Sequence, residues 1–166
     1  MKFPLGVLLL GLSYASFSVA LAIAGAAPKR VLLPVAVEHY YAIQAAFVGP
    51  LFAALIALHT KIVVAILHQK AGPRTSFGEA YLVLGNAYAW PLLALFVVPD
   101  ALVFALWGFD SIAKAMRFYA PVALLVILAL STIRARDLFG VTLPRALGAV
   151  FVGLVVQAML GGLLLR

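Results

Sequence analysis

Long uncharged, apolar runs alternate with short segments that hold the charged residues along this chain. A helix that crosses a hydrocarbon core about 30 Å thick needs roughly 20 residues. Four of the runs are long enough, or nearly long enough, to cross. We therefore predict membrane-spanning helices at 4–27, 80–106, 118–134 and 146–165.

A fifth span, second in chain order, is predicted at 50–68. It begins after the Gly49-Pro50 break, because proline is tolerated in the first turn of a helix. The preceding segment, 34–47, carries tyrosines and charged residues, and tyrosine favours the level of the lipid headgroups. We predict a separate interfacial or partly inserted helix there.

The composition agrees with this pattern. Hydrophobic residues make up 66% of the chain and charged residues 10%, against roughly 45–50% and 25% in soluble globular proteins. These proportions exclude a soluble enzyme, a disordered tail, a coiled coil and a nucleic-acid-binding module. The predicted fold class is an all-α, polytopic transmembrane helical bundle, forming a single integral membrane domain over 1–166.

The net charge of +7 does not indicate a nucleic-acid partner, because the longest basic run is the pair Lys29-Arg30. The cations lie between the apolar runs, where they hold spans against lipid headgroups. Cysteine is absent, which excludes disulfides, thiolate metal sites and cysteine nucleophiles.

The amino-terminal run resembles a signal peptide in its Lys2 start and its small residues near 22–26, but it is long enough to span, so we expect a retained helix. Five spans place the termini on opposite faces of the membrane. The positive-inside rule favours a cytoplasmic N-terminus, by a small excess. The cations of the N-terminal face are Lys2, Lys70, Arg74, Arg134, Arg136 and Arg145, and those of the other face are Lys29, Arg30, Lys114, Arg117 and Arg166.

Ionisable residues inside a bilayer are costly and often functional. Lys61 and His68 share one face of the second span, and Glu79 and Asn86 are equally spaced on the third. If the two helices are antiparallel neighbours, His68 lies level with Glu79 and Lys61 with Asn86. Such a polar ladder either relays protons or ions, or joins the two helices through hydrogen bonds. Lys61 alternatively extends to the headgroups.

Two further features leave alternatives open. Asp100 is either a buried intramembrane acid or the mark of a span that has reached the interface, and the second interpretation is favoured. His39, His59 and His68 share no common depth, whereas a haem in a bundle needs two facing imidazoles. We therefore expect neither haem nor a metal, and no cofactor. Catalytic motifs are also lacking in the sequence, so we do not expect an enzyme.

From Gly72 onward the sequence resembles the Yip (Ypt-interacting protein) domain family. The resemblance rests on GPRTSF at 72–77, LVLGNAYAWP at 82–91 and LFGVTLPRA at 138–146, and on the five spans. It implies a membrane protein that associates with other membrane proteins or shapes the bilayer, and it supplies no catalytic residues. Eukaryotic members carry a long cytosolic region before the first span, so this chain is similar to the short bacterial members. The resemblance implies structural roles for Gly72, Ser76, Phe77, Tyr88, Pro91 and Arg145.

The function expected from the sequence is that of a non-enzymatic protein of a bacterial inner membrane. Its partners would be lipids and other integral membrane proteins or further copies of itself, which it would meet through small-residue and polar helix faces. The alternative is a component of a small-solute, ion or proton transport system that uses Lys61, Glu79, Asn86 and Asp100. A haem-carrying anchor subunit is the weakest of the three hypotheses.

Overall fold

The computed structural model describes residues 3–28, 36–67 and 75–164, with side chains described up to residue 160. Every regular element in these ranges is a helix. In chain order they are α1 (Leu5–Ile23), η1 (Val37–His39), α2 (Tyr40–Leu67), α3 (Phe77–Leu92), the π-helical turn η3 (Leu93–Val97), α4 (Val98–Trp107), α5 (Phe109–Phe139) and α6 (Leu143–Leu164).

Five helical segments are long and apolar enough to cross a membrane, because α3, η3 and α4 form one continuous span, Phe77–Trp107. Their outward faces carry large apolar side chains, such as Ile23, which is 83% exposed, and Phe118, which is 81% exposed. In water such a surface would be unstable, whereas lipid solvates it. The chain is therefore a multi-pass membrane protein, and the predicted all-α transmembrane bundle of five spans is confirmed.

The prediction of a separate helix at 34–47, divided from the second span before Pro50, is wrong. Residues from Tyr40 onward belong to α2, which runs unbroken through Gly49 and Pro50 to Leu67. Proline removes only one backbone donor from the helix. In lipid the remaining donors and acceptors must still be satisfied within the chain, so continuing the helix is favoured over opening it.

The fourth span also differs from its prediction, since α5 begins at Phe109 and not near residue 118. The helix includes Lys114 and Arg117, whose side chains are exposed near its start. Long cationic side chains on a span can extend their charge toward the headgroups. A sequence count that ends each span at a charge therefore shortened this helix.

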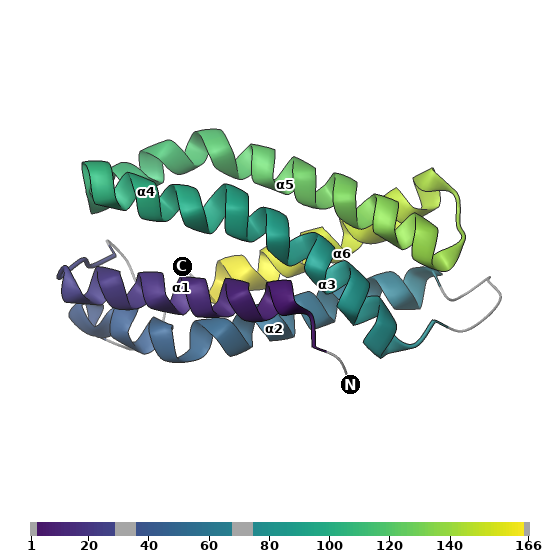
Figure 1. Ribbon diagram of the computed structural model, residues 1–166, viewed down its shortest axis with the longest axis horizontal. Coiled ribbons are helices and arrows are strands. Elements are labelled where there is room, and N and C mark those ends of the chain that lie inside the picture. The colour runs from purple at the N-terminus through teal and green to yellow at the C-terminus, as the bar shows by residue number, and fades with distance from the viewer. Residues whose placement is uncertain (1–2, 29–35, 68–74, 165–166) are drawn as a thin grey trace.

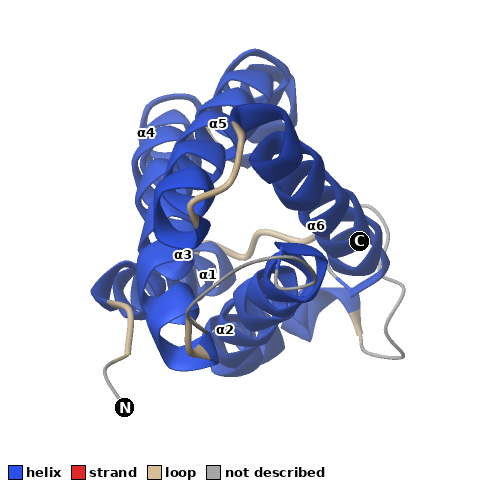
Figure 2. Cartoon of the chain, turned by 90° about the vertical axis from the view of Figure 1, so that its right-hand side faces the viewer, coloured by secondary structure: helices blue, strands red, loops and turns tan. Residues whose placement is uncertain are grey.

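The helices form a closed ring when viewed along the bundle (Figure 2). Helix α1 packs on α2, α2 on α6, α6 on α5, α5 on α3 and α3 on α1, and α2 also contacts α3. Figure 1 shows the N-terminal end of α1 directed toward the end of the bundle where α5 turns into α6. Glycines with positive φ, Gly108 at 77° and Gly140 at 60°, form the turns at the two ends of α5.

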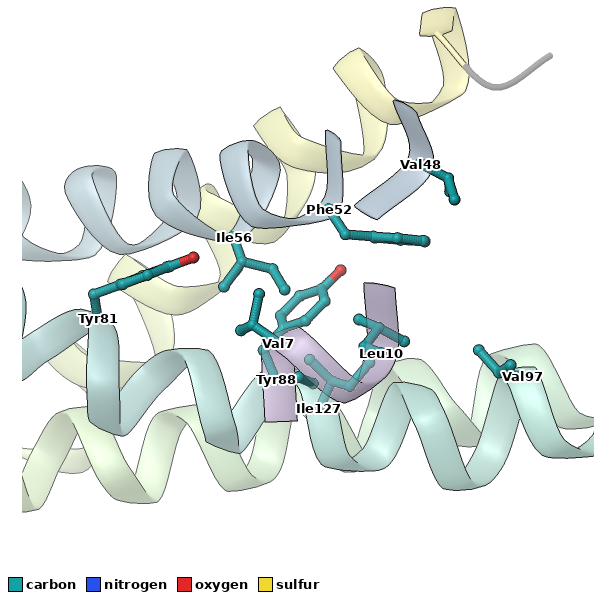
Figure 3. Close-up of a cluster of buried hydrophobic side chains, with 10 residues drawn as sticks. Val7, Leu10, Val48, Phe52, Ile56, Tyr81, Tyr88, Val97 and Ile127 are labelled. Carbon is teal, nitrogen blue, oxygen red and sulfur yellow. The ribbon is translucent and has the colours of Figure 1, made fainter. Parts of the chain in front are cut away.

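Two apolar clusters fill different parts of the ring. The first joins α1, α2, α3, η3 and α5, and Figure 3 shows Val7, Phe52 and Tyr88 meeting within it. The second joins α2, α3, α5 and α6 near the α5–α6 turn, through Val63, Leu67, Leu84, Ala135, Ala146, Ala149 and Val150. We call this second group the closing cluster, because it packs the interior of the bundle at that end.

Glycine lets α1 and α2 approach closely. A Cβ atom built on Gly11 would lie 3.0 Å from the Cα of Gly49, inside normal contact distance. A Cβ built on Gly49 would instead meet Gly11 at 3.7 Å, which is an ordinary van der Waals contact. The helix crossing therefore depends on glycine at position 11 more than at position 49.

The two glycines are therefore expected to differ on substitution. Gly11→Ala should lower the free energy of unfolding by about 1–3 kcal/mol, because a backbone atom of α2 must move. Gly49→Ala should lower it less, because its Cβ meets α1 only at an ordinary contact distance, although a Cβ directly before Pro50 is itself disfavoured in a helix. Reversible unfolding in mixed detergent micelles measures both, and equal effects would show that this crossing is not tightly packed.

Candidate functional site

A cavity of about 450 Å³ lies inside the bundle, with walls from all five spans. It extends from Tyr88 and Leu154 to Pro28, Tyr40 and Phe109, where α1 ends and α2 and α5 begin. Its remaining lining residues are Tyr14, Phe17, Leu21, Tyr41, Gln44, Phe52, Leu55, Leu92, Phe96, Asp100, Ile112, Met116, Leu124, Gln157 and Ala158. This internal position makes the cavity the candidate functional site, whereas three further hollows each lie between two or three neighbouring helices.

The third span is irregular where it passes the cavity. Pro91 lies inside α3 and Pro99 in the first turn of α4, on either side of the π-helical turn η3. Each proline lacks an N–H group and leaves one carbonyl of the helix without its usual donor. A π turn adds one residue to the helix and so rotates the helix beyond it by about 100°. Asp100 follows directly and lines the cavity.

Asp100 is the one carboxyl group among the cavity residues, and its side chain is only 3% exposed. The hydroxyl of Tyr119 on α5 donates a hydrogen bond to its Oδ1 atom. Tyr14 of α1 and Tyr41 of α2 line the same cavity as Asp100. The ring of Phe96 packs edge-on against Tyr119, with centroids 5.9 Å apart. Tyr119 of α5 therefore contacts this carboxyl group directly, and the tyrosines of α1 and α2 share its cavity.

A second polar group lies on α1 and α2, at the wall of the cavity. The Ser18 hydroxyl lies 3.1 Å from Gln44 Oε1, and Gln44 Nε2 donates to the Tyr40 hydroxyl at 3.4 Å. Both Ser18 and Gln44 are buried. Polar side chains that bond across two spans in this way help to fix the spacing of those spans.

Tyr88 and Gln157 line the deep part of the cavity, and His59 lies next to Tyr88 outside the lining. Tyr88 interacts with the side chain of Gln157, which is 5% exposed. Within the described part of the chain, Gln157 Oε1 has no hydrogen-bond partner. His59 is fully buried, with its ring centroid 5.8 Å from that of Tyr88.

Aromatic rings dominate the remaining walls. Eight of the lining side chains are Phe or Tyr. Edge-to-face contacts hold several of them: Tyr14 with Phe52 at 5.2 Å, and Tyr41 with Phe109 at 5.7 Å between centroids. The lining residues that the structure describes include no lysine, arginine or histidine. The cavity therefore offers π systems, hydroxyl and amide groups, and one acid.

The predicted polar ladder does not form between Lys61 and Asn86. Lys61 is exposed, and its Nζ lies 5.9 Å from the centre of the Phe77 ring. Asn86 instead accepts a hydrogen bond from the backbone N–H of Gly6 on α1, at 2.8 Å, and donates to the Leu82 carbonyl. The exposed Glu79 lies in the first turn of α3, and His68 lies outside the described residues. The sequence spacing could not reveal that α1 occupies the face of α3 that bears Asn86.

For Asp100, the structure agrees with the interpretation that the sequence favoured less, a buried acid. The sequence suggested a span end at the interface, whereas the helix continues past Asp100 to Trp107 and the side chain is buried. The interpretation as a buried acid agrees with these facts. The apolar stretch after Asp100 already indicated that the helix continues.

The residues to which the family resemblance assigns structural roles lie at helix ends and on a buried helix face, as far as they are described. Ser76 caps α3 by accepting from the Glu79 N–H at 3.2 Å, and Phe77 stacks on Tyr81. Arg145 donates to the carbonyl of Leu67, the last residue of α2, at 3.3 Å. Tyr88 and Pro91 belong to the buried face of α3, and Gly72 lies outside the described residues.

Four residues at or next to the cavity were not predicted as site residues: Tyr14, Gln44 and Gln157, which line it, and Tyr119, which bonds to Asp100. The signal available was a polar or hydroxyl-bearing side chain in four different spans. Nothing in the sequence showed that these spans turn those side chains toward one centre. Of the three histidines, His59 is buried, His39 is exposed in η1 and His68 is not described.

Comparison with known protein families, with curated proteins and with solved structures finds no match for this chain. Its similarity to the Yip family therefore stays a prediction. The function has to be inferred from the cavity itself, from the residues that line it and from its place in the membrane.

The bond between Tyr119 and Asp100 should contribute measurably to stability. Tyr119→Phe should lower the free energy of unfolding by about 1–3 kcal/mol, because it leaves a buried carboxyl oxygen without its donor. A double-mutant cycle that combines Tyr119→Phe with Asp100→Ala should give a coupling energy of about 1 kcal/mol, within the range for hydrogen bonds between membrane helices. Unfolding in mixed micelles measures all four proteins, and strictly additive losses would contradict the bond.

The contact between His59 and α6 gives a second prediction. A Cβ on Gly153 would lie 2.6 Å from Nδ1 of the fully buried His59 ring, so the ring or α6 would have to shift. Gly153→Ala should therefore lower the unfolding free energy by about 1–3 kcal/mol. Gly148→Ala is the matched control, because a Cβ there meets nothing within 4 Å. It should be neutral or stabilising by up to about 1 kcal/mol, as thermal unfolding in detergent would show.

Proposed function

We propose that this protein is a non-enzymatic, solute-binding component of a transport system in a bacterial inner membrane. The observation that carries the proposal is the cavity that all five spans share around the buried Asp100. Ionisable residues placed inside a membrane bundle commonly mark solute or ion pathways. A volume of about 450 Å³ is also within the usual range of small-molecule sites.

The two ends of the bundle differ in a way that suits a transport component. The cavity reaches the end where α1 ends and α2 begins, while the closing cluster packs the opposite end. A solute would thus enter from one face and meet packed side chains before the other. In the proposed orientation, with a cytoplasmic N-terminus, the cavity opens toward the outer face of the membrane.

The irregular third span supports the same proposal. Solute sites in transporters are often formed by helices that are interrupted near the middle of the membrane. Here Pro91, η3 and Pro99 interrupt one span beside the cavity. The helical segments on either side of η3 are joined by a weaker backbone hydrogen-bond ladder, and this gives α3 and α4 a place at which to shift relative to each other.

The second candidate function is assembly with partner spans, as the Yip resemblance implies. It is favoured by an apolar groove of about 370 Å³ between α1 and α2, which is lined by small residues such as Ala45, Ala46 and Gly49. Small residues let a neighbouring helix approach closely. The two candidates are compatible, because this groove and the Asp100 cavity share no lining residue. Neither candidate calls for a cofactor.

Cysteine labelling tests whether solutes reach the cavity, because the chain contains no cysteine of its own. Leu92→Cys places a thiol in the cavity wall, and Leu84→Cys places one in the closing cluster on the same helix. In proteoliposomes, N-ethylmaleimide should label position 92 at least about tenfold faster than position 84, because the thiolate forms only where water enters.

The pair of variants controls for labelling through lipid, since both thiols lie on α3 and both replace leucine. Equal and slow labelling at 92 and 84 would mean that solutes do not reach the cavity, and the proposed function would be wrong. A membrane-impermeant maleimide added from one side then reports which face the cavity opens to. Labelling from the N-terminal side alone would contradict the proposed access route.

A further inference from the structure

We propose that the cavity binds a small organic cation, a protonated amine on an apolar body. This inference rests on the proposed function and names the chemical class of its solute. The carboxyl group of Asp100, the aromatic walls and the amide of Gln157 support it together.

The charge of the cavity selects against anions and favours cations. Asp100 is its one carboxyl group, and the described lining residues contribute no basic side chain to balance it. An ionised carboxylate without a counter-charge is strongly disfavoured in an apolar interior. A cationic ligand beside Asp100 would supply that counter-charge, so binding it would offset the cost of the buried acid. An anion would add to the cost.

The aromatic walls separate an organic cation from a metal ion. Magnesium and calcium prefer six or more oxygen ligands, and the cavity offers one carboxyl group among apolar and aromatic side chains. Aromatic faces attract cations, most strongly where water is excluded. A cavity lined by eight rings and a single acid therefore suits a cation whose body is itself apolar. The edge-to-face pairs Tyr14–Phe52 and Tyr41–Phe109 hold several of these rings in place before a ligand arrives.

A hydrogen-bond acceptor in the same cavity fits the N–H groups of an amine. Gln157 is only 5% exposed, and no donor among the described residues bonds to its Oε1 atom. Unsatisfied acceptors at such burial are rare in folded proteins. A protonated amine carries several donors, which Asp100 and the tyrosine hydroxyls of the wall could accept. Gln157 Oε1 is buried within the wall and would accept one after its side chain turns toward the cavity. Tyr119 already fixes one oxygen of Asp100 through its hydrogen bond.

The test compares three probes of one size that differ in charge: benzylammonium, benzyl alcohol and benzoate. Calorimetric titration of the purified wild-type protein in detergent measures each affinity. Benzylammonium should bind at least about tenfold more tightly than benzyl alcohol, and benzoate should bind most weakly. This comparison needs no variant, so it does not depend on whether a substitution disturbs folding.

A charge-removing variant then locates the effect. Asp100→Asn should weaken benzylammonium binding at least about tenfold and change benzyl alcohol binding less than about twofold. Asp137→Asn is the matched control. It also removes one acid, but Asp137 pairs with Arg136 at the exposed end of α5, at 2.7 Å. It should leave both affinities unchanged.

The outcomes separate this inference from the proposed function. If benzyl alcohol binds as tightly as benzylammonium, or if Asp100→Asn leaves the preference intact, the inference is wrong while solute binding in the cavity stands. If none of the probes binds although Leu92→Cys is labelled rapidly, the inference is again wrong and the cavity takes another class of solute. If Leu92→Cys is not labelled, the proposed function itself fails.

Discussion

Hydrocarbon offers no hydrogen-bond partner to the polypeptide backbone, and the rest of this structure depends on that constraint. It makes each long apolar run a helix and lets α2 continue through Pro50. It also restricts irregular backbone to places where protein surrounds it. The π-helical turn between Pro91 and Pro99 meets this restriction in part, because its Val97 is buried and its Phe96 lines the internal cavity.

Polar side chains obey the same constraint by bonding between spans. The side chain of Asn86 on α3 accepts a hydrogen bond from the backbone N–H of Gly6. Gly6 lies in the first turn of α1, where N–H groups have no acceptor within their own helix. Arg145 satisfies a carbonyl at the end of α2, and Ser18 and Gln44 join α1 to α2. These contacts hold the ring of helices together, and the cavity exists because its walls are held apart by them and by large aromatic side chains.

Asp100 differs from these polar groups because stability alone does not explain its burial. A buried acid is costly in lipid, and an apolar residue of similar size would fill the same position without that cost. Tyr119 satisfies one of its oxygen atoms. The carboxyl group nevertheless lies among rings and amides in a shared cavity, where a bound solute of opposite charge would use it. Because burying Asp100 costs free energy without a structural need, we place the functional site in the cavity and not on the outer helix faces.

The sequence by itself determined that the protein is a helical membrane bundle with five spans, because length and hydropathy are local properties that each run carries alone. The sequence placed the start of the fourth span at 118, whereas α5 begins at Phe109, and it divided α2 before Pro50. Both errors have one cause: neither a charge nor a proline ends a helix whose backbone groups have no other hydrogen-bond partner. Only the tertiary structure decided that Asn86 faces α1 and that Tyr14, Gln44, Asp100 and Gln157 converge. Such convergence depends on how each helix is rotated about its axis, and that rotation is set by contacts between spans, such as the approach of Gly11 to Gly49, which no single span encodes.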